Sequence, residues 1–174
     1  MSGNIVDVIK KRRSVRAFKG EPVPEGVLAQ ILDAARWAPS AGNLQPWEFY
    51  VVRNQDTKKG LAKAALGQMF LAEAPVVIVV CAVPARSGRR YRERGEKLYC
   101  LQDTAAAVQN ILLAAAGFGL GSCWVGAFDE EGARRVLGLG PDLRPVAMVP
   151  LGYPAEAPSA PGRRSLEEIV HVVD

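Results

Sequence analysis

Four side chains that could bind an anion lie within five residues near the start of the chain. The run RRSVR, residues 12–16, contains Arg12, Arg13, Ser14 and Arg16. Guanidinium groups match the oxygens of a phosphate group, and the serine hydroxyl adds a further donor. The run therefore indicates a phosphate site, although a basic helix end that runs into solvent would have the same composition.

A second polar stretch is the uncharged run APSAGNLQPW at residues 38–47. It offers a hydroxyl at Ser40 and amides at Asn43 and Gln45. One interpretation is a ledge of small residues that lets a flat ligand approach while the amides address its edge. The other is a helix-to-strand connection whose amides bind neighbouring backbone groups, with Trp47 packed in the core.

The composition is that of one globular domain. The 174 residues are 49% hydrophobic and 23% charged, so we expect a single domain over residues 1–174. The longest apolar stretches, at 75–84 and 111–121, are too short to cross a membrane, and no signal peptide opens the chain. We therefore expect a cytoplasmic protein with no membrane partner.

The positive charge is confined to one segment. Residues 84–97, PARSGRRYRERGEK, hold six Lys or Arg and two Glu, which accounts for the whole net charge of +4. The rest of the chain is neutral, which argues against nucleic acid as a partner, since nucleic-acid-binding proteins usually spread positive charge over a whole face. The segment itself could recruit phosphate groups or an anionic substrate, or it could be a solvated mobile loop.

Cysteine and histidine are too sparse for several kinds of chemistry. Cys81, Cys100 and Cys123 form no CxxC pair, which argues against a disulfide framework and against a zinc site. The single histidine, His171, is the fourth residue from the end, and we expect it to be structural. No metal is therefore expected.

Hydrophobic periodicity predicts helices and strands in alternation. The expected helices are 4–13, 24–38, 57–73 as one helix or a broken pair, about 97–116, and a short helix from the Asp129 cap to Leu137. The expected strands are 48–52, 76–83, which should be buried on both faces, 122–128 and 145–151. A loop at 153–164 should lead into a capping-box turn at Ser165 and Glu168. Alternation alone favours a doubly wound parallel sheet, but neither GxGxxG nor a P-loop occurs.

Taken in order, the motifs resemble those of the FMN-dependent nitroreductase family. They are RRSVR, APSAGNLQPW, AEAPVVIVVCA, QDTAAAVQNILLAA, GLGSCWVGAF, and LGYP with RRSLEEIV, and they span nearly the whole chain. The resemblance implies an α+β nitroreductase fold with a mixed, largely antiparallel sheet flanked by helices, which replaces the parallel sheet. It also implies an interlocked homodimer with FMN at the interface, where the apolar helix at about 97–116 packs and the C-terminal extension reaches the partner.

The same resemblance implies roles for individual residues in binding FMN. Arg12, Arg13, Ser14 and Arg16 would lie along the phosphate, ribityl chain and pyrimidine edge, with Arg16 near N1 and O2. Arg163 and Arg164 match the pair of arginines that binds the phosphate in the family. Which of the two contributes more to phosphate binding stays open. Pro39, Ser40, Ala41 and Asn43 would cover the isoalloxazine bound by the partner, while Gln45 would bond near it or hold the loop. Gln68 would reach the pyrimidine edge, and Trp124, Val125, Gly126 and Ala127 would face N5 and O4 through their backbone.

The implied reaction is a ping-pong hydride transfer from NAD(P)H through flavin N5 to a small electron-poor acceptor such as a nitroaromatic or quinone. No catalytic side chain is needed, because the flavin carries the chemistry. One alternative is another flavin reaction on the same fold: dehalogenation, azoline oxidation or consumption of FMN. Another is a non-catalytic flavin-binding or basic interaction protein. The acceptor, the choice between NADH and NADPH, and reactivity with oxygen stay open.

Overall fold

The computed structural model describes residues 4–173, which form a four-stranded sheet in the order β1-β2-β4-β3. The strands are β1 (Trp47–Val52), β2 (Val76–Ala82), β3 (Gly121–Ser122) and β4 (Arg144–Gly152). Every neighbouring pair is antiparallel, with Val79 facing Tyr50 of β1 on one side and Met148 of β4 on the other. A single parallel bridge, Ser14 to Ser122, extends the edge. The α+β fold with a mixed, largely antiparallel sheet is therefore confirmed.

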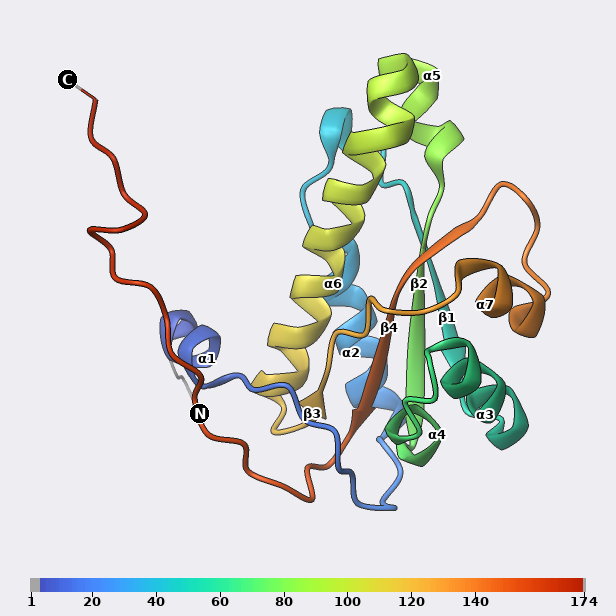
Figure 1. The fold of residues 1–174 in the computed structure, drawn as a ribbon, viewed down its shortest axis with the longest axis vertical. Helices are drawn as coiled ribbons and strands as arrows, with labels where there is room; N and C mark the ends of the chain where they lie inside the picture. The colour runs from blue at the N-terminus through green and yellow to red at the C-terminus, as the bar shows by residue number, and fades with distance from the viewer. Residues whose placement is uncertain (1–3, 174) are drawn as a thin grey trace.

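Helices cover both faces of this sheet (Figure 1). They are α1 (Ile5–Lys11), α2 (Glu25–Arg36), α3 (Gln55–Ala64), α4 (Phe70–Glu73), α5 (Pro84–Arg94), α6 (Cys100–Gly117) and α7 (Glu130–Leu137). A 3₁₀ turn, η1 (Ala41–Asn43), and a π-helical turn, η2 (Gly95–Tyr99), complete the set in the described residues. Helices α2 and α6 pack on one face, and α3, α4 and α7 pack on the other.

The position of the central strand β2 between two helical layers explains why its sequence is apolar throughout. Ile78 and Val80 point into the core shared with α2 and α6, whereas Val77 and Val79 point into the core shared with α3 and α7. All seven residues of β2 are buried. Alternate side chains of a strand face opposite sides, so a strand between two helical layers has no polar face. The prediction of a strand buried on both faces is confirmed.

The parallel sheet predicted from alternation is wrong because of the break between α3 and α4. Leu66 and Gly67 both have positive φ, at 58° and 78°, and end α3. The two short helices pack on each other and stay at the end of the sheet where β1 finishes (Figure 1). Since the chain does not cross back over the sheet, β2 runs antiparallel to β1. The broken pair was one of the two forms expected for residues 57–73.

Two further expectations differ from the structure. The strand predicted at 122–128 is wrong, because only Gly121 and Ser122 pair with β4 and the chain then keeps a single bridge from Val125 to Met148. Between these points Trp124 is 40% exposed, so the segment leaves the sheet. Residues 84–94 form helix α5 after Pro84, which suits a first helical turn, so the alternative of a loop there is wrong.

The described part of the C-terminal extension, from residue 155, contains no helix or strand and leads away from the body of the domain (Figure 1). The predicted capping box is present, since the Ser165 N–H donates to Glu168 Oε2 at 2.8 Å. His171 is exposed in this extension.

Candidate functional site

The residues of RRSVR form an extended segment along the edge of the sheet. The N–H of Val15 donates to the carbonyl oxygen of Ser122 at 2.9 Å, and the Val15 side chain is buried. A methyl group at Gly121 would lie 2.7 Å from Val15 Cγ1, so glycine is needed for this close approach. Because side chains alternate along an extended chain, burying Val15 leaves Ser14 and Arg16 on the opposite side.

A pocket of about 320 Å³ lies on that side. We call it the arginine pocket, and its lining residues are Arg12, Arg13, Ser14, Arg16, Pro158, Ser159, Pro161 and Arg163. The first predicted motif and one of the two late arginines therefore meet, although about 150 residues separate them in sequence. Arg164 turns away, with Nη2 bonded to the Glu168 carbonyl oxygen at 3.0 Å and Nε 4.0 Å from the Glu168 carboxylate.

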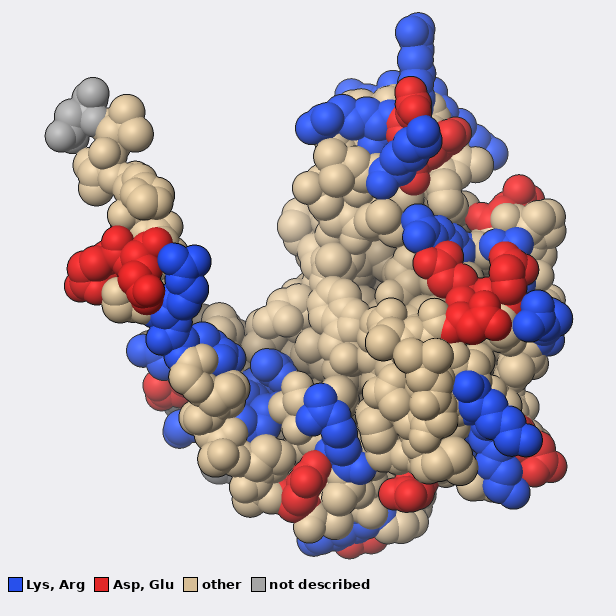
Figure 2. All heavy atoms as spheres, viewed as in Figure 1, with Lys and Arg blue, Asp and Glu red and all other residues tan. Residues whose placement is uncertain are grey.

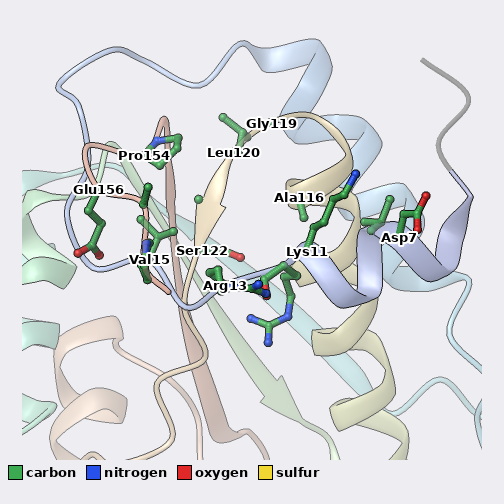
Figure 3. A pocket seen from close by; sticks show the side chains of 15 residues that line it. Asp7, Lys11, Arg13, Val15, Ala116, Gly119, Leu120, Ser122, Pro154 and Glu156 are labelled. Carbon is green, nitrogen blue, oxygen red and sulfur yellow. The ribbon is translucent and has the colours of Figure 1, made fainter. Parts of the chain in front are cut away.

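The C-terminal side of the arginine pocket is held by one carboxylate. Glu156 Oε1 accepts hydrogen bonds from the backbone N–H groups of Arg16 and Ala17, the latter at 3.1 Å. Glu156 also lines a second pocket of about 470 Å³ on the other side of the segment, between α1, the end of α6 and β3 (Figure 3). It is the acidic group nearest the backbone of this segment, and it ties residues 154–158 to RRSVR.

Gln68 and the segment after β3 are joined directly. Gln68 Nε2 donates to the carbonyl oxygens of Ala65 at 2.9 Å and Ala127 at 3.0 Å, which uses both amide hydrogens and leaves Oε1 as an acceptor. Val125 exchanges both backbone hydrogen bonds with Met148 and is buried, so its backbone is committed to the sheet. Trp124, Gly126 and Ala127 are exposed.

Arg16 extends from RRSVR toward the same region. Its guanidinium carbon lies 5.9 Å from the centre of the Phe70 ring in α4, close in sequence to Gln68. A cation held over an aromatic face keeps its N–H edge free for another partner. Arg16 therefore reaches the helix next to Gln68, and Gln68 in turn is bonded to Ala127.

The ledge, residues 39–45, is a separate structure with internal hydrogen bonds. Ser40 Oγ accepts from the Gln45 N–H at 3.0 Å, and Gln45 Nε2 donates to the carbonyl and side-chain oxygens of Asn43 at 3.3 Å. Gly42, Asn43 and Gln45 all have positive φ, at 59°, 55° and 49°. The amides thus bind neighbouring groups, as the connection interpretation predicted, and Trp47 is buried in the core. Such a strained backbone persists only where its surroundings hold it.

The ledge and the RRSVR segment lie at opposite ends of α6 (Figure 1). The ledge is bonded to Asp103 in the first turn of that helix, through the Ala41 N–H, whereas RRSVR packs on β3 just beyond Gly117 at its end. About 21 Å of helix axis separates Asp103 from Gly117 at the usual helical rise. One chain therefore does not bring the two predicted halves of the site together.

The family model described as the Nitroreductase family matches residues 9–73 and 66–153. The chain belongs to the nitroreductase family. It is accordingly an enzyme of the oxidoreductase class, as the motifs predicted.

Relatives and solved structures agree with this membership. The chain is 37% identical over 187 residues to a Thermus thermophilus protein named NADH dehydrogenase, covering 92% of this chain and 91% of that one. A nitroreductase family protein from Clostridium novyi matches with a TM-score of 0.81 and 34% identity, covering 88% of this chain and 87% of that chain. A nitroreductase family protein from Streptococcus pneumoniae matches with a TM-score of 0.89 and 25% identity, covering 98% of this chain and 100% of that chain. The nitroreductase fold is therefore confirmed.

Two charged residues of this nitroreductase-family protein escaped the sequence reasoning. Asp103 is 8% exposed and bonds Ala41; burial raises the pKa of its carboxyl group, and the Ala41 hydrogen bond opposes that rise. Arg86 donates to the Gln45 carbonyl oxygen at 2.7 Å and to Glu48 at 2.8 Å. The signal for Asp103 was available, since it is the one charged residue in helix 100–117. Within residues 4–173 no helix is long and apolar enough to cross a membrane.

Proposed function

We propose that this nitroreductase-family protein binds FMN at the interface of a homodimer and uses it to transfer hydride equivalents from NAD(P)H to small electron-poor acceptors, such as nitroaromatics or quinones. The observation that carries the proposal is the convergence of Arg12, Arg13, Ser14, Arg16 and Arg163 on one pocket. The name of the Thermus relative supports a nicotinamide nucleotide as electron donor.

The residues of the arginine pocket suit a phosphate monoester. Four guanidinium groups and a serine hydroxyl offer many donors, whereas Glu156 already accepts two backbone N–H groups and so is turned to the chain. Charge-assisted hydrogen bonds of this kind are about twice as strong as neutral ones. In the proposed site Arg163 grips the phosphate, and Arg164 contributes less because it is bonded to Glu168.

The surface beside the pocket would receive the ring system. Arg16 would place positive charge near the pyrimidine edge, and Gln68 Oε1 would accept a hydrogen bond there. The exposed Trp124, Gly126 and Ala127 would lie along the ring near N5 and O4. Val125 serves instead to anchor this segment to β4. When bound, FMN supplies reversible hydride acceptance, so the side chains need only bind, orient and polarise it.

A second subunit would complete the site. Because about 21 Å of α6 separates the ledge from RRSVR, Pro39, Ser40, Ala41 and Asn43 are proposed to cover the flavin bound by the partner. Ser40 Oγ accepts from the Gln45 N–H, so its hydroxyl hydrogen is left to donate. Gln45 holds the loop, which favours the second of its two expected roles.

The surface of α1 and α6 supports a dimer. Ile5, Ile9 and Phe118 are between 42% and 60% exposed. Ile5 and Phe118 also line, with Val8 and Leu113, an apolar groove of about 450 Å³. Exposed apolar groups gathered on a helix pair are typical of a subunit contact.

Anaerobic stopped-flow spectroscopy of the purified protein with FMN tests the reaction. NADH or NADPH should bleach the flavin absorbance, and a nitroaromatic or quinone added next should restore it. Protein without affinity for FMN would contradict the proposal. Bound flavin that neither nucleotide bleaches would instead favour the non-catalytic alternative. Product analysis separates dehalogenation, azoline oxidation and FMN consumption from simple acceptor reduction.

Mixed dimers test whether the ledge acts on the partner's flavin. Arg12→Ala weakens the arginine pocket and Asn43→Ala weakens the ledge, so each homodimer should lose flavin. A heterodimer of the two variants has one site in which both halves are intact, and it should regain flavin at that site. If mixing restores nothing, the two halves do not meet across an interface.

A further inference from the structure

Helix α5 carries arginines that have no acidic partner. Arg86 pairs with Glu48 at 2.8 Å, and Glu93 pairs with Lys97 at 2.5 Å. Four exposed arginines remain without a carboxylate within salt-bridge distance in the described part of the chain: Arg89, Arg90, Arg92 and Arg94. The one other acid of the segment, Glu96, lies with its carboxylate against Gly88. Blue side chains accordingly gather over α5 in Figure 2.

Two of these guanidinium groups are held in place by tyrosine rings. Arg90 lies 5.5 Å from the centre of the Tyr91 ring, and Arg94 lies 5.3 Å from that of Tyr99, whose hydroxyl oxygen accepts from Arg94 Nε at 2.9 Å. The two rings meet edge to face, with centres 5.2 Å apart. A stacked guanidinium loses less conformational freedom on binding and keeps N–H groups for an oxyanion.

The cationic end of α5 is attached to the ledge. A methyl group at Gly42 would lie 2.8 Å from both Arg90 Nη1 and Tyr91 Oη, so these two groups touch the turn itself. Arg86 Nη1 also donates to the Gln45 carbonyl oxygen at 2.7 Å. Because α5 is bonded to the ledge, any site that the ledge covers also lies close to the positive charge of α5.

We propose that Arg89, Arg90, Arg92 and Arg94 form an oxyanion-binding site at the mouth of the flavin site that the ledge covers, and that this site favours substrates carrying phosphate or carboxylate groups. The inference rests on the proposed function, because it takes the ledge to lie over the partner's flavin. The shared chemistry is the oxyanion; its source is the pyrophosphate of the nicotinamide dinucleotide or a carboxylate on the acceptor. Attraction at such a site acts over about 8 Å at physiological salt, so it is confined to the approach to the ring.

Substrate pairs that differ in charge test the inference with the holoenzyme. On the donor side NADH is compared with neutral N-benzyl-1,4-dihydronicotinamide, and on the acceptor side 4-nitrobenzoate with its methyl ester. The variant is Arg89→Gln with Arg90→Gln, and Arg90→Lys is the conservative exchange. Arg53→Gln, at the far end of β1 and paired with Glu25, removes one charge elsewhere as the control.

The double variant should raise KM for the anionic member of at least one pair by about tenfold, with kcat and the neutral members unchanged. Arg90→Lys should keep most of the selectivity, and the control should match the wild type. Equal changes for charged and neutral substrates, or no change, would overturn the site. The pair that responds identifies the source of the oxyanion.

A measurement without turnover decides the same question independently. The oxidised holoenzyme is titrated calorimetrically with ADP-ribose and with benzoate, and benzamide serves as the neutral counterpart of benzoate. The double variant should lose about tenfold in affinity for at least one anion and keep its affinity for benzamide. Unaltered anion affinity overturns the inference even if the flavin reaction is intact. Failure of NADH and NADPH to reduce wild-type flavin would instead count against the proposed function, while these affinities still decide the anion site.

Discussion

Both carboxylate oxygens of Asp103 accept a hydrogen bond from the backbone N–H of Ala41, each at 3.2 Å. The contact joins the start of η1 to the first turn of α6. Arg86 holds the other end of the same loop through the Gln45 carbonyl oxygen. The ledge is thus fixed from α6 and from α5, which explains how two non-glycine residues in it keep positive φ.

Replacing Asp103 by Asn should change how stability depends on pH. Burial raises the pKa of this carboxyl group above its ordinary 3.8, so the folded protein holds the proton to a higher pH than the unfolded chain. The free energy of unfolding contributed by Asp103 therefore falls as pH rises from about 3.8 through the raised pKa. Asn has no such proton. Urea unfolding across this window should show the wild type losing stability relative to Asp103→Asn as pH increases; parallel curves would contradict this.

Arg163→Ala and Arg164→Ala form a matched pair of variants, because the two neighbouring arginines differ mainly in the direction of their side chains. Arg163 lines the arginine pocket, whereas Arg164 is bonded to Glu168. Loss of one charge-assisted contact should weaken FMN binding by about tenfold or more for Arg163→Ala. Arg164→Ala should stay close to the wild type. Fluorescence titration of the apoprotein with FMN measures both, and the reverse order would refute the assignment of Arg163.

Gly126→Ala tests whether a flat ring approaches the backbone after β3. The added methyl group would meet nothing closer than Trp124 Nε1 at 3.7 Å, so the fold should keep its melting temperature. With a flavin against this backbone, the crowding should cost about 1–3 kcal/mol of FMN affinity. Gly140→Ala, an exposed site where nothing lies within 4 Å of the new methyl group, is the control. Unchanged FMN affinity in Gly126→Ala would move the ring elsewhere.

The three cysteines should be inert in the folded protein. All are buried, and burial raises the pKa of the Cys81 thiol to about 12 and also raises those of Cys100 and Cys123. Because the thiolate is the reacting form, iodoacetamide at about pH 8 should leave native protein unmodified. In urea all three should be alkylated, as mass spectrometry would show. One rapidly labelled thiol in the native state would disprove the burial described for it.

Patterns within a short stretch of sequence were enough for most of the elements and for the parts of the candidate site. The seven apolar residues of β2 predicted a doubly buried strand because periodicity reports which faces meet the core. RRSVR indicated an anion site from its donors alone. The strand prediction for 122–128 is wrong, since within this stretch only Ser122 and Val125 pair with β4. Pairing partners, not propensity, decided how much of it became strand.

What the sequence determined by itself is therefore local: the helices, the buried strand, the donors of RRSVR and the motif order that marks the family. The family resemblance implied the antiparallel sheet, but only tertiary structure shows its cause, the fold-back of α3 on α4, and shows Arg163 and Arg12 lining one pocket. Tertiary structure also decided that the ledge sits at the far end of α6 from RRSVR, held by Asp103 and Arg86. The reason is physical: periodicity and capping act over a few residues, whereas these relationships arise from packing between segments far apart in the chain.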